Sequence, residues 1–89
     1  MHIRGIVQTA RLEENPAGSG TIEMHLSVQG VGPGQPRQLI IPHALLLADE
    51  SLDADLIEGR GFAATLESEG QRWVVTQIAF ASRVLRAPE

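Results

Sequence analysis

The feature that most constrains the fold is a strict alternation of apolar and polar side chains over residues 21–29. Ile22, Met24, Leu26 and Val28 share one face of an extended chain, and the residues between them are polar or charged. A period of two is typical of an antiparallel strand with one buried and one solvated face. The pattern therefore predicts a sheet protein whose core lies on one side of this strand.

Four further segments have the composition of strands, and each is bounded by turn or loop residues. The first contains Gly5, and a glycine inside a strand is typical of a bulge or sharp bend, so the apolar face is expected to change there. Pro42 ends the third strand because proline has no amide hydrogen for a ladder. The expected strands are 3–12, 21–29, 37–41, 60–67 and 71–85.

Only residues 43–57 have helical character. Leu45, Leu52 and Leu56 are separated by seven and four positions, which places them on one helical face. Ser51 is a suitable N-cap for a second short helix that would end at Gly59. The sequence thus predicts helical structure between the third and fourth strands.

The order of three strands, a helix and two strands predicts one domain over residues 1–89. Five short strands leave open edges unless the sheet closes on itself, and a small barrel closes it. The Greek-key OB-fold has this inventory, with its helix between strands three and four. We therefore expect an all-β protein of small helical content, a five-stranded OB-fold barrel. A split or open α+β sandwich is the alternative.

The composition indicates the cellular compartment and excludes several kinds of site. The chain has no cysteine, which excludes disulfides, thiolate metal sites and thiol nucleophiles. No window approaches the ~18 consecutive apolar residues of a membrane span. The N-terminus has no signal-peptide pattern. We expect a cytoplasmic protein with no membrane partner.

Charge is distributed unevenly along the chain. All seven basic residues are arginines, and the formal net charge is −4. Residues 49–69 contain one arginine and seven acidic residues, whereas residues 70–89 contain three arginines and one acidic residue. Nucleic-acid-binding domains are usually basic. Any nucleic acid would therefore meet a local patch and be bound with modest affinity.

No pattern indicates catalysis, a metal or a cofactor. His2, His25 and His43 lack a second ligand at helical spacing. The acidic run 49–58 lacks the glycine and the twelfth-position glutamate of a calcium loop. The glycines of 30–34 match no phosphate-binding loop and lead into a strand. We expect no enzymatic activity and no cofactor.

Binding is the better-supported kind of function. OB-folds that bind nucleic acid use a face on strands two and three, with basic residues and aromatic platforms. Strand two turns Glu23, His25, Ser27 and Gln29 outward, and Arg37 begins strand three. His25 and Gln29 are expected to donate or accept hydrogen bonds there.

The aromatic and basic residues complete this expected site. Phe62 and Phe80 have the apolar parity of their strands and are expected in the core, which leaves Trp73 as the stacking residue. Arginine suits both phosphate pairing and stacking on bases. The expected phosphate contacts are Arg4, Arg11, Arg37 and Arg72.

Four segments also match family motifs in order. They are an apolar-x-Gly-x-apolar opening at 3–7, a strand after a glycine-containing loop at 20–28, a helix end, glycine and strand at 56–64, and an arginine and an aromatic before alternating apolar residues at 71–78. In these segments the chain resembles the bacterial single-stranded DNA-binding proteins and their relative, primosomal replication protein N. The resemblance implies an OB-fold, single-stranded DNA (or RNA) as ligand and a role in DNA replication.

The chain departs from that family at three places. The third strand has Gln38, Leu39, Ile40 and Ile41 in place of stacking aromatics, and the hairpin before the last strand is reduced to 68–70. Glu58 stands where the family has lysine. Two hypotheses follow: a domain that binds single-stranded nucleic acid, or a protein-interaction and assembly module. For a barrel this small, assembly into a homo-oligomer (dimer or tetramer) is expected to add stability.

Overall fold

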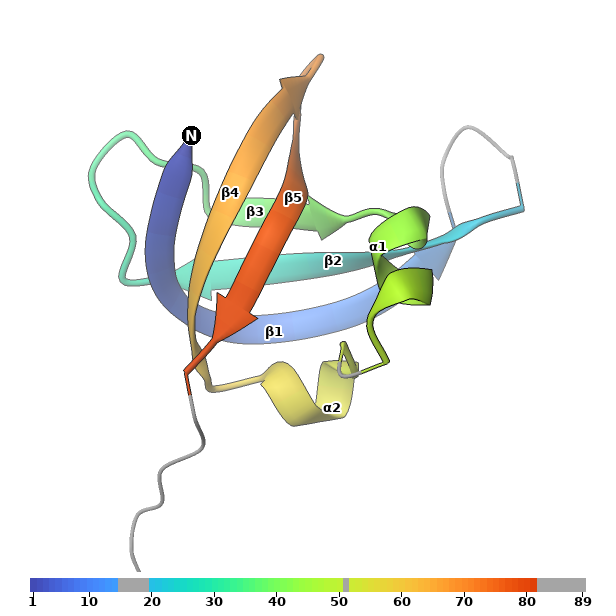
Figure 1. The fold of residues 1–89 in the computed structure, drawn as a ribbon. Helices are drawn as coiled ribbons and strands as arrows, with labels where there is room; N and C mark the ends of the chain where they lie inside the picture. Colours follow the sequence, from blue (N-terminus) through green and yellow to red (C-terminus); the bar gives the residue numbers. More distant parts are fainter. Residues whose placement is uncertain (15–19, 51, 82–89) are drawn as a thin grey trace, which may run out of the picture.

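The computed structural model describes residues 1–14, 20–50 and 52–81. Its elements are β1 (His2–Glu14), β2 (Ile22–Gln29), β3 (Gln38–Ile41), α1 (His43–Ala48), α2 (Ala54–Ile57), β4 (Gly61–Glu69) and β5 (Arg72–Phe80). The strands form a closed barrel in the order β1-β2-β3-β5-β4 (Figure 1). All neighbouring strands are antiparallel except β3 and β5, which are parallel and joined at Ile40 and Val74. The predicted all-β OB-fold barrel is confirmed, and closure excludes the open sandwich.

β1 changes its buried face at a bulge rather than at its glycine. Ile3 and Val7 are buried before a register shift between Val7 and Thr9, and Ala10 is buried after it. One extra residue in a strand moves the following side chains to the other face. Gly5 has a different role. A Cβ there would lie 2.5 Å from the carbonyl oxygen of Gln29, so only glycine allows β1 to approach the end of β2 this closely.

β5 contains a second bulge. Leu66 pairs with Val75 and Thr65 with Gln77, which leaves Thr76 as the extra residue. Val75 is therefore fully buried in the first half of β5, while Ile78 and Phe80 pack against the core in the second half. Phe62 is buried and Phe80 half-buried against the core, in line with the expectation for both. The predicted strand residues beyond 81 lie outside the described part of the chain.

The helical segment divides into two short helices. Asp53 caps α2, because its side chain accepts a hydrogen bond from the amide of Asp55 at 2.9 Å. The proposed cap Ser51 lies outside the described residues. Leu56 was expected on the buried face but is 50% exposed, and Ile57 is buried in its place. The start of α2 explains this error: the helix begins at Ala54 and not after Ser51, so Leu52 lies before it and the spacing of four between Leu52 and Leu56 does not define a helical face.

Apolar side chains from the strands and from the helical segment fill the barrel interior. β2 contributes Met24, Leu26 and Val28, as its alternation predicted, whereas Ile22, the first residue of β2 and expected on the same face, is 39% exposed. Leu52 and Ile57 from the helical segment belong to the same core cluster. Within the described residues, no helix is long and apolar enough to cross a membrane.

Candidate nucleic-acid interface

One end of the β2 outer face contains a buried carboxylate. Glu23 is only 4% exposed, although the alternation placed it on the solvated face. Arg72 Nη2, at the start of β5, donates to Glu23 Oε2 at 2.5 Å, and His25 Nε2 lies 3.2 Å from Glu23 Oε1. The expectation that Glu23 is solvent-facing is wrong because its main partner comes from a strand 49 positions further along the chain.

These contacts keep Glu23 charged. Burial by itself raises the pKa of a carboxyl group, but the hydrogen bonds and positive charge of Arg72, together with those of His25, outweigh burial and hold the pKa of Glu23 below its ordinary value. Arg72 therefore stabilises a buried charge. The guanidinium of Arg72 thus stabilises the fold, and a ligand would have to compete with Glu23 for it.

The same network extends to β1. Glu13 Oε1 lies 3.8 Å from His25 Nδ1, and Arg11 Nη2 lies 2.6 Å from Glu13 Oε2. Arg11, His25 and Arg72, three of the expected ligand contacts, thus each face a carboxylate. A phosphate would have to displace these carboxylates. The cost is small only at Arg11, which is 71% exposed and belongs to a weak surface pair.

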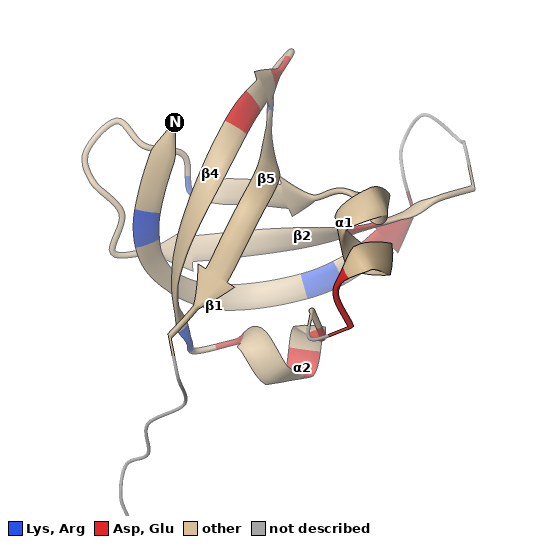
Figure 2. Ribbon diagram, in the orientation of Figure 1, with Lys and Arg blue, Asp and Glu red and all other residues tan. Residues whose placement is uncertain are grey.

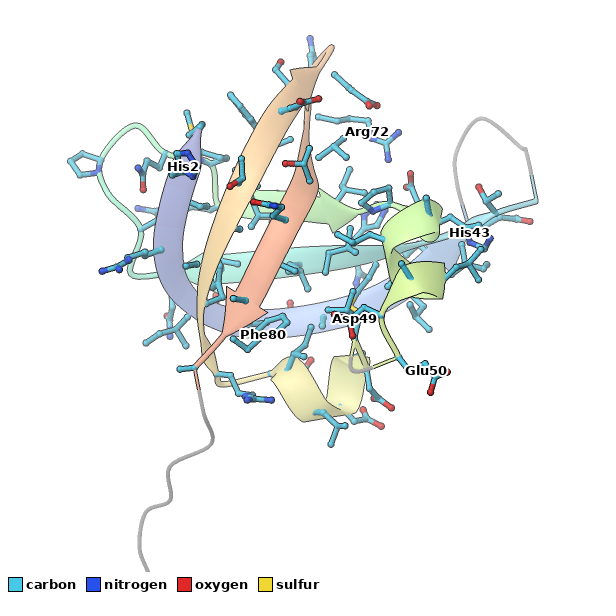
Figure 3. The ribbon with its side chains drawn as sticks, viewed as in Figure 1. His2, His43, Asp49, Glu50, Arg72 and Phe80 are labelled. Carbon is cyan, nitrogen blue, oxygen red and sulfur yellow. The ribbon has the colours of Figure 1, made fainter. Side chains whose placement is uncertain are left out.

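Trp73, the expected stacking residue, is half-buried and packs against the core cluster. Its strand position pairs with Ser68 of β4. Figure 3 shows Arg72, its neighbour in the chain, on the opposite side of the barrel from His2. The packing of Trp73 against the core leaves only part of its ring surface accessible to a base.

The other end of the same face has a polar hollow of about 410 Å³, formed by β1, β2, β3 and the loop between β2 and β3. It is lined by Gln8, Ser27, Val28, Gln29, Gly30, Val31, Arg37 and Gln38, and we call it the polar hollow. Arg37 is exposed, and its guanidinium has no ion pair or hydrogen bond within the described residues. The structure therefore brings two predicted residues, Gln29 and Arg37, together in one cavity.

The remaining predicted residue, Arg4, lies in a separate groove on β1, β4 and β5. Its volume is about 910 Å³. Like that of Arg37, the Arg4 guanidinium has no partner within the described residues. The seven predicted residues thus occupy three places. Arg11, His25 and Arg72 belong to the network around Glu13 and Glu23, which we call the carboxylate network, and Trp73 lies next to it in the chain. Gln29 and Arg37 line the polar hollow, and Arg4 lines the groove.

The acidic residues lie away from both hollows. Figure 2 shows most of them around α1 and α2, at the tip of the β4–β5 hairpin and at the end of β1, and one on β4 itself, where Glu67 follows the groove residue Thr65 by two positions. The lining of the polar hollow contains no Asp or Glu, and the same is true of the groove. In the part of the chain that the structure describes, the polar hollow and the groove therefore each combine an arginine with a lining free of carboxylates, which suits an anion.

Sequence reasoning missed several residues. Gln8 lines the polar hollow, but glutamine on an exposed strand face has no distinctive pattern. For strand three the sequence leaves open whether Gln38 or Leu39 faces outward beside Arg37, and the structure shows Gln38 exposed and Leu39 buried. Glu58, at the family's lysine position, accepts a hydrogen bond from the Ala10 amide at 2.9 Å, just past the β1 bulge. No local signal reveals this role because the partners are 48 positions apart.

The described residues contain no group of three His, Cys, Asp or Glu side chains placed to hold a metal ion. Comparisons with protein-family models, with curated proteins and with solved structures find no match to this chain.

Proposed function

We propose that this protein is a non-enzymatic, cytoplasmic OB-fold domain that binds single-stranded nucleic acid, DNA or RNA, at the polar hollow. The observation that carries the proposal is the guanidinium of Arg37, which has no ion pair or hydrogen bond to the described residues and lies beside Gln29, Ser27 and Gln38. The hollow lies on β2 and β3, the strands that OB-folds use for oligonucleotides. Arginine pairs with phosphate and stacks on bases, and the amides form hydrogen bonds with base edges.

The resemblance of segments 3–7, 20–28, 56–64 and 71–78 to bacterial single-stranded DNA-binding proteins supports the same ligand and a role in DNA replication. The polar hollow contains no aromatic side chain. A stacked base contributes about 1–3 kcal/mol per aromatic platform, so binding without one is weaker and depends mainly on phosphate contacts. We therefore expect modest, salt-sensitive affinity.

The test is titration of a fluorescein-labelled oligo-dT, followed by anisotropy, at about 20 mM and then about 200 mM salt. Each phosphate contact contributes a slope of about −0.7 in log K against log salt. Arg37→Ala should weaken binding about three- to tenfold and make the slope shallower. Failure of the wild-type protein to bind at the lower salt concentration would refute the proposal.

A matched pair of variants locates the site. Gln38 lines the polar hollow, whereas Gln71 lies in the β4–β5 turn, and both are exposed. Gln38→Glu and Gln71→Glu add the same charge, so a general electrostatic effect is equal in both. A site in the polar hollow requires the larger loss from Gln38→Glu. A larger loss from Gln71→Glu would instead place the ligand beside Arg72 and Trp73.

A second candidate function is an assembly or protein-interaction module. Leu47 is 72% exposed and Leu56 50% exposed, and acidic residues surround them in the α1–α2 segment. Isolated exposed apolar side chains are common on protein surfaces, so these two leucines define only a candidate contact surface, for a basic partner or a second copy of the chain. Sedimentation velocity tests it. A homo-oligomer that dissociates in the Leu47→Ser/Leu56→Ser variant supports this candidate, and a monomer at all concentrations contradicts self-assembly.

A further inference from the structure

The groove that contains Arg4 crosses three strands. The ladders place Arg4, Ala63 and Ala79 in one row across β1, β4 and β5, and His2, Thr65 and Gln77 in the next. Both rows line the groove, together with Gly30, Gly32 and Gln35 of the β2–β3 loop and Leu45 of α1. Two of the three residues in the Arg4 row are alanines, whose short side chains leave space beside the guanidinium. A bulky ligand has room there.

The groove and the polar hollow meet at the β2–β3 loop. Gly30 lines both of them, and the loop contributes Gly32 and Gln35 to the groove and Val31 and Arg37 to the polar hollow. Gly30 adopts a φ of +75°, which side-chain-bearing residues rarely adopt, so glycine suits the turn at this point. The residue that the two cavities share therefore has no side chain.

Charge distinguishes this pair of cavities from the rest of the molecule. Arg11 and Arg72 are paired with carboxylates, and Arg60 donates to the carbonyl oxygen of Ala81 at 2.6 Å. Arg4 and Arg37 are the arginines of the described residues whose guanidinium groups have no partner, and each lies in one cavity. Two unpaired cations in joined cavities without acidic residues match a ligand with repeated negative charge.

We propose that a single strand bound in the polar hollow continues over the β2–β3 loop into the β1–β4–β5 groove, where Arg4 contacts a second phosphate. The inference rests on the proposed function and extends it from one cavity to a continuous path. Gln77 and the side-chain amide nitrogen of Gln35 offer hydrogen bonds along that path, whereas Gln35 Oε1 already accepts one from the Gly32 amide at 2.8 Å. The short side chains of Ala63 and Ala79 leave room for a base or sugar. The protein would then protect more nucleotides than one cavity can hold.

Strand length separates the two contacts. An OB-fold covers about 4–16 nucleotides, so a strand of about 4 nucleotides fits one cavity and one of about 12 reaches both. Arg4→Ala should weaken binding of the longer oligo-dT about three- to tenfold and make its salt slope shallower by about 0.7. The shorter oligo-dT should bind Arg4→Ala and the wild type alike. Arg37→Ala should weaken binding of both lengths.

A second pair of variants distinguishes a loss of binding at the groove from a loss of binding caused by destabilisation of the fold. Ala79→Glu places a carboxylate in the groove, and Ala44→Glu places one on α1 outside both cavities; both alanines are exposed. Selective loss of the longer strand in Ala79→Glu, with Ala44→Glu unaffected, supports the path. If the wild type binds and neither Arg4→Ala nor Ala79→Glu weakens the longer strand, the path is wrong while the proposed function stands. If the wild type binds neither length, the proposed function itself fails, and the path fails with it.

Discussion

The two ends of the β2 outer face use the same residue types for different purposes. At one end Arg72 and His25 lie against the buried carboxylate of Glu23. At the other end Arg37 lies beside glutamines and a serine, with no carboxylate in the cavity. An arginine that neutralises a buried acid holds strands together, whereas an arginine without a partner is available to a ligand. The comparison shows that the position of the carboxylates, more than the number of arginines, decides where an anion can bind.

Removal of Arg72 should have the largest effect. Arg72→Ala leaves the charge of Glu23 buried without its main partner, and we expect a loss of about 1–3 kcal/mol in the free energy of unfolding. Arg37→Ala should stay within about 0.5 kcal/mol, as is usual for an exposed residue. Urea denaturation measures both. The double variant Arg72→Ala/Glu23→Gln should recover part of the loss, and equal stability of the two single variants would contradict the assigned roles.

Acid should weaken the same end of the molecule. The pKa of Glu23 is lowered in the folded protein, so its stabilising contribution is complete above the ordinary glutamate pKa of about 4.3 and is lost as pH falls through the lower native value. Among the described residues, His25 and Arg72 are the ionisable groups that contact it, and Glu13 is linked to it through His25. Between about pH 6 and pH 3 the wild type should therefore lose more stability than Glu23→Gln. Parallel pH profiles of the two proteins would contradict this.

Salt dependence sharpens the contrast between paired and unpaired arginines. Arg37→Ala should reduce the salt slope of oligo-dT binding by about 0.7, whereas Arg11→Ala should reduce it by less, because Arg11 already faces Glu13. Both residues are exposed, and both variants remove one positive charge. Anisotropy titrations over a series of salt concentrations give the two slopes. A larger decrease of the slope in Arg11→Ala than in Arg37→Ala would show that the ligand binds near the carboxylate network.

The smallest effect is expected at Trp73. It lines neither cavity and packs against the core, so its emission should change little when oligo-dT binds. Because the chain has one tryptophan, the signal is unambiguous. Strong quenching on binding would show that the ligand reaches the start of β5, as the sequence alone predicted.

Local patterns predicted most of the barrel and only part of the candidate site. The alternation in residues 21–29 identified β2 because its period depends on neighbouring residues alone. The bulge in β5 was not predicted, because apolar residues occupy both parities of this strand, with Val74 and Ile78 on one and Trp73 and Val75 on the other. The change of face in β1 was predicted at Gly5 but occurs at Gln8. The prediction failed because a glycine that allows close approach of two strands looks the same in the sequence as a glycine at a bulge.

The site was harder to predict because its contacts join distant strands. Nothing near Glu23 in the sequence indicates that Arg72 covers it, and the alternation rule treats every polar residue on an outer face as solvated. The separation of Arg37 from Arg72 follows from barrel closure, which no local pattern encodes. Residue types on strands two and three could be listed from the sequence, but which of them are already paired could not.

The joint between β3 and β5 has a consequence for the dynamics of the barrel. β3 is four residues long and meets β5 at a single pair, Ile40 and Val74, whereas β1–β2 and β4–β5 form long ladders. Local opening begins where few backbone hydrogen bonds must break, so amide hydrogen exchange should be fastest along this joint. Glu23 on β2 and Arg72 on β5 lie on either side of β3 in the strand order and bridge across it. Their ion pair therefore adds a side-chain contact across a joint with few backbone hydrogen bonds. Arg72→Ala should raise amide exchange along β3 and β5, where opening exposes strand edges through which small β proteins associate with one another.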